Sequence, residues 1–412
     1  MKAGFSRVEI TPDFSAAMAG FDRRTAPSVG VLDPLYVSVL ALEDASGERF
    51  LFCSYDVLGV ERSLCDSLRR ELAGNLTVSP DRIWVCATHT HSAPSCVFSY
   101  SKHYDENYIA QLHRKTVAAA ENAIQQLQQA QMAAGVSGVS GVSSRRNQGR
   151  AGADFAMPLL KVQFTTEQQQ ITICGFRCHP TILDEKNLLF SRDLPGAVAA
   201  QAENGERIFF LNGACGDLST RFTRTESSPA ELRRIGGILA KGLDETAVTP
   251  VDALDGIRAS RKQITLSRGA GPEGAQRTEL MDALRQLMAQ CRDSQMLREY
   301  DSRLAVLERQ NVTAEPARIV EICAVDMGAF TLLGIPFELD SGDCTVMERA
   351  LWDVAGKPVY VQCYTGGYDG YLPSGAPLTI NSSYEDIASR YMPESREQVL
   401  ECAKQCILEI MS

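Results

Sequence analysis

The sequence lacks the features that mark membrane-spanning, secreted and nucleic-acid-binding proteins. None of its hydrophobic runs reaches the roughly 18 apolar residues of a membrane span, and the N-terminal segment 1–14 has no apolar stretch like that of a secretion signal. Lys and Arg total 41 against 51 Asp and Glu, so the net charge is −10. This charge argues against a general nucleic-acid-binding surface and against anionic membranes. We therefore expect no nucleic-acid partner and no stable membrane insertion.

Cysteine is plentiful, but its arrangement fits neither a disulfide framework nor a cysteine zinc site. The 13 cysteines are an odd number, and no two have the spacing CxxC. Several lie inside apolar runs, as Cys53, Cys86 and Cys174 do. That placement is typical of reduced cysteines in a protein core. Together with the missing secretion signal, it predicts a cytoplasmic protein.

The patterning of the chain predicts an α/β fold. A hydrophobic content of 44% with 22% charged residues excludes a disordered chain. Helical periodicity is clear in two stretches, 109–127 and 280–307, the second with a break after Cys291. Strands and helices interleave irregularly, which favours mixed β-sheets layered with flanking α-helices. Short apolar runs predict strands at Tyr36–Leu42, Phe50–Tyr55, Arg82–Ala87, Leu159–Phe164, Ile171–Cys178, Arg207–Leu211, Ile322–Val325, Thr331–Ile335 and Val359–Cys363.

The 412 residues suggest two or three domains as a starting estimate, but one large domain fits the pattern better. The Gly-rich segment Ser267–Gly274 resembles a linker, yet apolar strands resume beyond it without a change of composition. We therefore expect a single catalytic domain over residues 1–412, with a helical insertion at about 270–315.

Histidines are scarce, and three of the five directly follow predicted strands. His89 and His91 lie in ATHTHSAP, and His179 lies in RCHP. Strand ends are where α/β proteins place their sites, and neutral imidazole is a common metal ligand. If the strand continues through the HTH motif, both histidines share one face and can serve as two ligands or as a ligand and an acid–base group. The alternative is a structural pair that caps buried carbonyls. His103 and His113 are expected to be structural or solvated.

Three further strand ends carry polar groups. The turn Asn212–Ser219, NGACGDLS, exposes backbone N–H groups that can form an anion nest, although such sequences are often simple turns. Ser219 is then a nucleophile or a polar contact. Glu338, in IPFELD, is either a ligand or an acid near a helix N-terminus. The segment Cys363–Leu372 combines tyrosines with glycines, and its tyrosines either pack or polarise a carbonyl group.

Together these segments resemble the catalytic domain of the neutral, or non-lysosomal, ceramidase family. The resemblance runs from residue 8 to about Glu385 and keeps the order of the family's motifs. It departs from the family at Thr220, where the family's GDxSP motif has a proline, and in a tract one residue longer before Tyr384. The matching pieces are VEITP, THTHSAP, CHPT, NGACGDLS, PFELDSGD, GYDGYLPS and SSYE.

The resemblance implies one zinc ion and a set of residues around it. The implied zinc ligands are His89, His179, Glu338 and Tyr371. His91 would lie beside the metal, where it contacts substrate or transfers a proton. Ser219 matches a serine that the family requires for activity, Tyr384 matches a tyrosine near the scissile carbonyl, and Arg146 matches a site arginine.

The resulting hypothesis is a zinc-dependent hydrolase that cleaves an amide (N-acyl) or ester bond with a zinc-activated water. Family members carry an export signal and a C-terminal immunoglobulin-like domain, and we expect neither here. A small soluble N-acyl or ester substrate is therefore expected in preference to membrane ceramide. The alternative is a non-catalytic relative that binds a small molecule or carbohydrate, but all four ligand types are present, which favours the enzyme. A metal-free hydrolase using Ser219 and His91 ranks lowest, because the usual GxSxG elbow is missing. Neither the acyl group nor the oligomeric state follows from the sequence.

Overall fold

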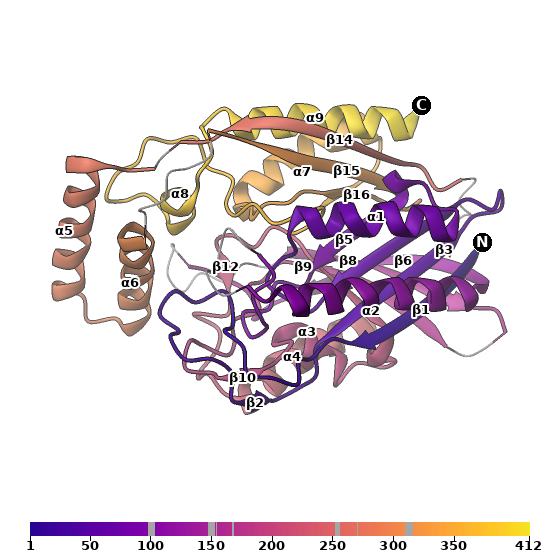
Figure 1. Ribbon diagram of the computed structural model, residues 1–412, viewed down its shortest axis with the longest axis horizontal. Coiled ribbons are helices and arrows are strands. Elements are labelled where there is room, and N and C mark those ends of the chain that lie inside the picture. The colour runs from indigo at the N-terminus through magenta and orange to yellow at the C-terminus, as the bar shows by residue number, and fades with distance from the viewer. Residues whose placement is uncertain are drawn as a thin grey trace.

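Two β-sheets form the centre of the fold (Figure 1). The computed structural model describes residues 1–97, 104–146, 153, 155–166, 169–251, 256–269, 271–309 and 316–412. Within them, the larger sheet has nine strands and runs in the order β11 (Ile208–Asn212), β9 (Gln170–Phe176), β8 (Phe155–Phe164), β6 (Gln128–Val139), β1 (Lys2–Glu9), β3 (Tyr36–Glu43), β4 (Arg49–Tyr55) and β5 (Ile83–Ala87), with β13 (Thr249–Pro250) beside β6. The smaller sheet has the order β14 (Ala259–Ser267), β15 (Ala317–Asp326), β16 (Thr331–Gly334) and β17 (Val359–Gln362).

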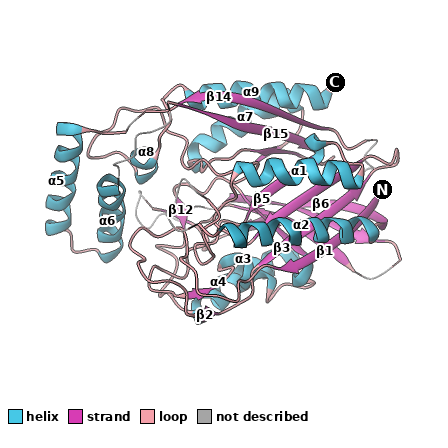
Figure 2. Cartoon of the chain, in the orientation of Figure 1, coloured by secondary structure: helices cyan, strands magenta, loops and turns pink. Residues whose placement is uncertain are grey.

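Each half of the larger sheet has a face that packs against helices, because side chains alternate along a strand. In β3, Val37 and Val39 join a core cluster with the buried residues of helices α1 (Arg62–Leu76) and α2 (Glu106–Gln125). In β11, Phe210 joins a separate cluster with helices α3 (Leu194–Ala199) and α4 (Pro229–Glu245). The helices therefore form outer layers, α1 and α2 on one half of the sheet and α3 and α4 on the other (Figure 2).

A third core cluster fills the space between the opposite faces of the two halves. It joins Phe52 and Trp84 from β4 and β5 to Ile173 and Phe209 from β9 and β11. Residues of β15, β16 and β17 belong to the same cluster, so the smaller sheet also closes on it. The layers of helix, sheet, core, sheet and helix confirm the predicted α/β fold of mixed sheets with flanking helices.

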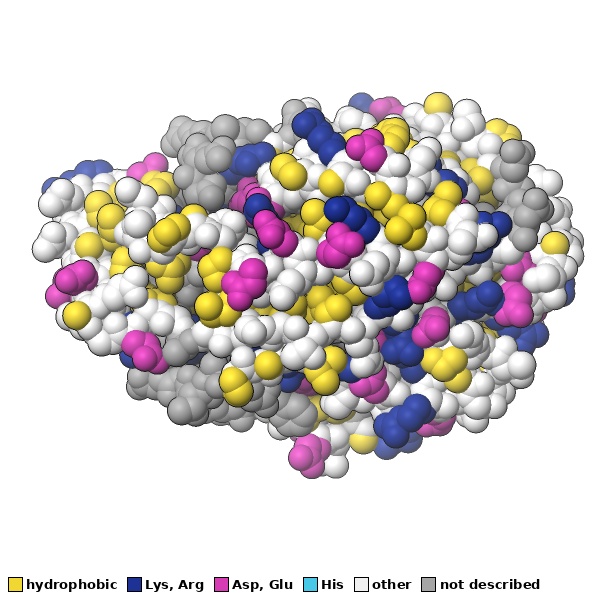
Figure 3. Space-filling model, turned by 90° about the horizontal axis from the view of Figure 1, so that it is seen from above, with side chains coloured by type: hydrophobic (Ala, Val, Ile, Leu, Met, Phe, Trp, Pro, Cys, Tyr) yellow, Lys and Arg dark blue, Asp and Glu magenta, His cyan; other side chains and the backbone are white. Residues whose placement is uncertain are grey.

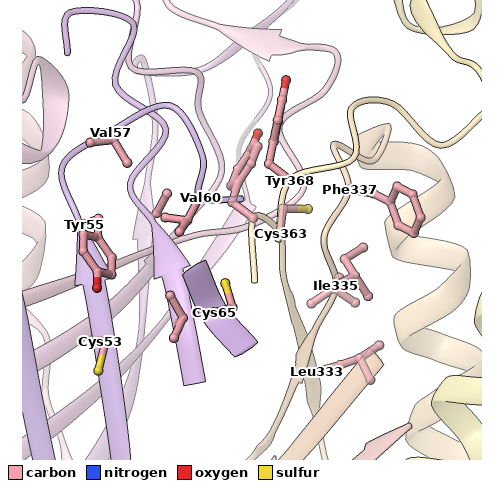
Figure 4. Packing of buried hydrophobic residues seen from close by; sticks show 14 of the residues in the cluster. Cys53, Tyr55, Val57, Val60, Cys65, Leu333, Ile335, Phe337, Cys363 and Tyr368 are labelled. Atoms are coloured by element: carbon pink, nitrogen blue, oxygen red, sulfur yellow. The ribbon is translucent and has the colours of Figure 1, made fainter. Parts of the chain in front are cut away.

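The smaller sheet has its own helical cover. Helices α7 (Ser341–Ala355) and α9 (Ser395–Met411) contribute buried side chains to the cluster that also holds Leu333 and Ile335. Figure 4 shows Leu333 and Ile335 in this cluster together with Cys53 and Tyr55 of β4. One continuous core thus connects the two sheets.

Two further helices stand at one end of the molecule. Helices α5 (Gly274–Gln290) and α6 (Ser294–Arg309) lie beside the short helix α8 (Tyr384–Ala388), and all three share an apolar cluster (Figure 1). They correspond to the predicted helical stretch with its break after Cys291. Residue 270 and residues 310–315 of the expected insertion lie outside the described residues.

The predicted strands all correspond to observed ones, although several bounds differ by a few residues. Strands β15 and β16 pair antiparallel as a hairpin that turns at Met327-Gly328. Helices α1, α4 and α7 were not predicted. In α4, Gly236 and Gly237 weaken the helical signal, and Gly236 is required because a Cβ there would meet Ala197 at 2.6 Å.

The surface mixes residue types. Side chains of both charge signs are interspersed with hydrophobic ones on the face seen from above (Figure 3). Among the described helices, none has both the length and the hydrophobicity needed to cross a bilayer.

The strand ends of both sheets meet in one place. The pairs β4–β5, β9–β11 and β16–β17 are parallel, so their carboxyl ends face the same way. The amide of Asn212, at the end of β11, donates to the carbonyl of Thr88, just after β5, at 3.2 Å. Backbone bridges join Cys86 to Thr365 and Gly213 to Gln362. Both edge strands of the larger sheet therefore meet the end of β17, and the loops beyond these ends surround one region.

Candidate metal centre

Three histidines and one glutamate converge where these strand ends meet. The candidate ligand atoms of His89, His91 and His179 all lie within 4.8 Å of one another. Oε2 of Glu338 lies 3.0 Å from Nε2 of His179 and 3.5 Å from Nε2 of His89. His89 is 0% exposed and Glu338 1%. The structure thus brings together residues from three separate strand ends.

A sharp turn at His89 brings the two histidines of the HTH motif together. The strand ends at Ala87, and His89 has φ = 70°, so the strand does not continue through the motif. Nε2 of His91 nevertheless lies 3.4 Å from Nε2 of His89. A non-glycine residue with positive φ is uncommon and is held by surrounding contacts. Here the His89 N–H donates to the Val57 carbonyl at 3.0 Å.

The outer ring nitrogens of two histidines are fixed by backbone carbonyls. Nδ1 of His89 lies 2.7 Å from the carbonyl oxygen of Leu58. Nδ1 of His179 lies 2.6 Å from the carbonyl oxygen of Cys215. A carbonyl can only accept, so each Nδ1 carries the proton and each Nε2 offers its lone pair inward. This is the arrangement found around metal-binding histidines.

The carboxylate of Glu338 completes the donor set. The hydroxyl of Tyr368 donates to its Oε1 at 2.5 Å. Its Oε2 is fully buried and has no hydrogen-bond partner, and the same holds for Nδ1 of His91. A buried carboxylate oxygen without a partner is costly unless a cation is close to it. The donor set of imidazole nitrogen and carboxylate oxygen therefore fits a metal ion such as zinc.

The electrostatics of the centre favour the protonation states that bind metals. Burial, together with the nearby charge of Arg146, lowers the pKa of His179 to about 4. Burial, with the neighbouring histidines, also holds the pKa of His91 well below its ordinary value. Neutral histidines and an ionised carboxylate are the forms that coordinate metals.

The other predicted site residues lie beside this cluster. His91, Arg146, Ser219, Glu338, Tyr371 and Tyr384 all line one pocket. Nη2 of Arg146 donates to the hydroxyl of Tyr371 at 3.4 Å and to Glu385 at 2.7 Å. The ring of Tyr384 packs edge-on against that of Tyr371, with centroids 5.5 Å apart. Tyr371 also forms a backbone bridge with Glu338, which places the two proposed ligands on adjacent segments.

Ser219 is held directly next to His179. The two residues form a parallel backbone bridge, and the His179 N–H donates to the Leu218 carbonyl at 3.0 Å. The Ser219 hydroxyl accepts from the N–H of Arg221 at 3.2 Å. Asp217 anchors the turn by accepting from the N–H of Ser341 at 2.8 Å. The turn expected from the NGACGDLS motif is therefore rigid and close to the cluster.

Several contact residues were not predicted from the sequence. The ring of Tyr364 stacks on His89 at 3.9 Å between centroids. Gly20 lies against His91, where a Cβ would meet the ring at 2.4 Å, and Phe21 packs edge-on against the same ring. Tyr364 lies in the tyrosine-rich segment singled out above, whereas nothing in the sequence around Gly20 signals this contact.

The remaining histidines lie elsewhere or outside the described residues. His113, on α2, is 3.7 Å from Glu71 and partly exposed, as expected of a solvated residue. His103 lies outside the described residues.

Comparison with known proteins supports the fold and gives no match by sequence. Neither a protein-family model nor a curated protein matches the chain. Two solved structures that match are a ceramidase complexed with C2 and the neutral ceramidase of Pseudomonas aeruginosa. Each match covers 99% of this chain and 74% of the other, with a TM-score of 0.76 and identities of 16% and 18%, respectively. The chain therefore has the neutral ceramidase fold, with a buried histidine cluster that can hold a metal ion at the ends of its strands.

Proposed function

We propose that this protein is a zinc-dependent hydrolase that cleaves the amide bond of small N-acyl compounds, or an equivalent ester bond. The observation that carries the proposal is the convergence of three imidazoles and the unpartnered Glu338 carboxylate oxygen at the pocket. The similarity in fold to ceramidases, which are amide hydrolases, supports the type of bond.

In this proposal, His89, His179, Glu338 and Tyr371 hold the metal. Zinc in such a site polarises a carbonyl group and lowers the pKa of a water molecule toward neutrality. The backbone carbonyls of Leu58 and Cys215 fix the ring orientation of the two histidines. Tyr368 fixes the carboxylate of Glu338 in the same way.

His91 is the proposed acid–base group. Burial holds the pKa of His91 well below the usual range, so its ring is neutral near pH 7, which is the form from which a general base acts. Phe21 and Gly20 pack against the ring and restrict its orientation. His91 would take a proton from the attacking water and return it to the leaving amine, so that an amide and water give a carboxylic acid and an amine.

Ser219, Tyr384 and Arg146 are the proposed contacts to the reacting carbonyl. All three line the pocket beside Glu338. Fixed hydroxyl and guanidinium donors stabilise the negative charge that develops on a carbonyl oxygen during hydrolysis. Arg146 holds its position through Glu385, and its charge lies over the ring of Tyr384 at 5.4 Å.

The pocket walls favour a polar substrate. Charged side chains of α6 and of residues 22–23 line them, among them Arg298, Glu299 and Asp301. A long acyl chain would take these charged groups out of water and offer them no hydrogen bonds in return, which is costly even for paired charges. We therefore propose a small, soluble substrate in place of long-chain ceramide.

The test combines metal analysis with an activity panel. Purified protein should contain about one zinc ion per chain, and it should hydrolyse short soluble N-acyl or ester compounds faster than long-chain ceramide in vesicles. Metal-free protein should be inactive, and added zinc should restore its activity. If zinc-loaded protein binds panel compounds without cleaving any of them, the protein is a binding protein and the proposal is wrong. Faster cleavage of vesicle ceramide would contradict the substrate class alone.

A further inference from the structure

The pocket contains one arginine that forms no close ion pair with a carboxylate of the described residues. The other arginines of the α6 side are paired there: Arg23 with Asp301 at 2.7 Å, Arg221 with Glu299, and Arg298 with Glu185. Arg146, near the cluster, is paired with Glu385 at 2.7 Å. Arg224 also lines the pocket, but no carboxylate of the described residues lies within ion-pair distance of it.

The guanidinium of Arg224 is held in place on one side only. Its Nη1 donates to the carbonyl oxygens of Thr181 and Ile182, in the loop just after His179. In the described part of the chain, its Nε and Nη2 make no hydrogen bond, and neither atom is sealed from solvent. Burial and the nearby charge of Arg298 lower the pKa of Arg224 to about 10, so it remains charged at pH 7. Arg224 therefore offers free, charged donors at a wall that the pocket shares with a neighbouring hollow lined by Arg292 and Asp293.

The geometry of this fork suits a carboxylate. Two adjacent N–H donors of a guanidinium match the two oxygens of a carboxylate. A guanidinium that carries one charge and has no close ion-pair partner suits the single charge of a carboxylate better than the greater charge of a phosphate monoester. Arg224 is anchored to the loop that follows His179 and lines the same pocket as Ser219, so a ligand that binds its free donors from this pocket lies in the candidate active site.

We propose that Arg224 binds a free carboxylate of the substrate, so that the preferred substrates are N-acyl compounds with a carboxylate, such as N-acyl amino acids. This inference rests on the proposed hydrolase function for its chemistry, but the binding of the carboxylate does not require turnover.

The test measures binding directly. N-acetyl-, N-butyryl- and N-hexanoylglycine are compared with the corresponding glycinamides by calorimetry at pH 7, because each pair differs only in the charged group. In wild-type protein at least one acid should bind about 10-fold to 100-fold more tightly than its amide, the range expected for hydrogen bonds to a charged group. The variant Arg224→Gln should lose this difference.

Two controls separate this arginine from other causes. Arg7 is also largely buried, donates to a backbone carbonyl, and has no carboxylate within ion-pair distance among the described residues. Arg7→Gln should therefore keep the preference for the acid. The preference should also survive removal of the metal with a chelator, since a metal ion can itself bind a carboxylate.

Three results would overturn the inference. The first is that acid and amide bind equally, or not at all, throughout the series. The second is that Arg224→Gln keeps the preference for the acid. The third is that wild-type protein loses this preference when the metal is removed. Tighter binding of an N-acyl phosphoethanolamine than of any acid would overturn the assignment to a carboxylate. Failure of the hydrolase proposal looks different, because the acids would still bind preferentially and no bond would be cleaved.

Discussion

The hydroxyl of Tyr368 donates a hydrogen bond to Oε1 of Glu338 and thereby leaves Oε2 to face His89 and His179. Tyr368 packs closely against Gly59: a Cβ added at Gly59 would lie only 2.6 Å from the Cβ of the tyrosine. The orientation of the carboxylate toward the cluster thus depends on a residue that need not bind the metal.

Replacing Tyr368 by Phe should weaken metal binding without unfolding the protein. Loss of the hydrogen bond frees the carboxylate to rotate, and losses of such supporting contacts typically lower metal affinity by about 10-fold to 100-fold. Competition with a chelator of known affinity measures the change. Tyr55→Phe is the matched control, because its hydroxyl contacts Thr116 in the core and does not line the pocket. Equal affinity in Tyr368→Phe and wild type would contradict the role given to Tyr368.

Removing either histidine whose Nδ1 is fixed by a carbonyl should abolish metal retention. His89→Ala and His179→Ala each delete an inward-facing Nε2, and we expect both purified variants to lack the metal on elemental analysis. His113→Ala, a partly exposed histidine on α2, should retain it. Full metal content in both of the first two variants would exclude the site.

The hydroxyl of Tyr371 should affect metal affinity as well as turnover. Tyr371→Phe removes the oxygen next to Arg146, which is also the proposed fourth ligand. We expect a lower metal affinity by chelator competition together with lower activity. An unchanged affinity would assign the fourth position to another group, such as a water molecule.

Removing the proposed carbonyl contacts should lower turnover while the metal stays bound. Ser219→Ala and Tyr384→Phe each delete one donor that does not belong to the ligand set, and loss of such a donor typically costs about 10²-fold to 10³-fold in rate. Steady-state kinetics on a substrate found by the panel, run beside metal analysis, measures both quantities. Ser137→Ala is the control, since its hydroxyl donates to the Gly242 carbonyl at 3.1 Å, away from the pocket. Near-normal turnover in Ser219→Ala would leave the turn with a structural role only.

The buried carboxyl of Glu385 should give stability a characteristic pH dependence. Burial outweighs the attraction of Arg146 and raises its pKa from 4.5 to about 7. A raised pKa means that the folded state binds the proton more tightly, so this contribution to the free energy of unfolding is complete below pH 4.5 and is lost as the pH rises through 7. Each unit of pKa shift corresponds to about 1.4 kcal/mol.

Denaturant unfolding of wild type and Glu385→Gln across this pH range checks the expectation. The stability of wild type relative to the variant should fall between pH 4.5 and 7. A constant difference over that range would show that the carboxyl does not titrate there.

The sequence predicted the place of the centre better than its geometry. His89 and His179 stand directly after apolar strands, and such ends converge in parallel sheets, so their approach could be expected. The turn at His89 could not, because its positive φ is held by contacts with Val57 and Leu58, which are distant in sequence. From spacing alone, His89 and His91 would share one face of a continued strand. In the structure the two rings meet because the chain turns sharply at His89.

The roles of the tyrosines also depend on contacts that a sequence does not show. Tyr364, Tyr368 and Tyr371 lie in one Gly-rich segment, whose backbone takes positive φ at Tyr364 and at three glycines, a course that the sequence alone does not show. The helical stretch at α6 was predictable from its periodicity. Its position on the pocket wall was not, since it is held by ion pairs such as Arg23–Asp301, between residues 278 positions apart.

The wide spacing of the donors along the chain has a consequence for how the protein is made. His89, His179 and Glu338 come from three strand ends, and the last belongs to the smaller sheet near the C-terminal part of the chain. A growing chain on the ribosome can therefore fold much of the larger sheet while the carboxylate is still unmade. The full donor set exists only after the smaller sheet has docked, so a metal ion bound by this set would be captured late in biogenesis and could not guide the early steps.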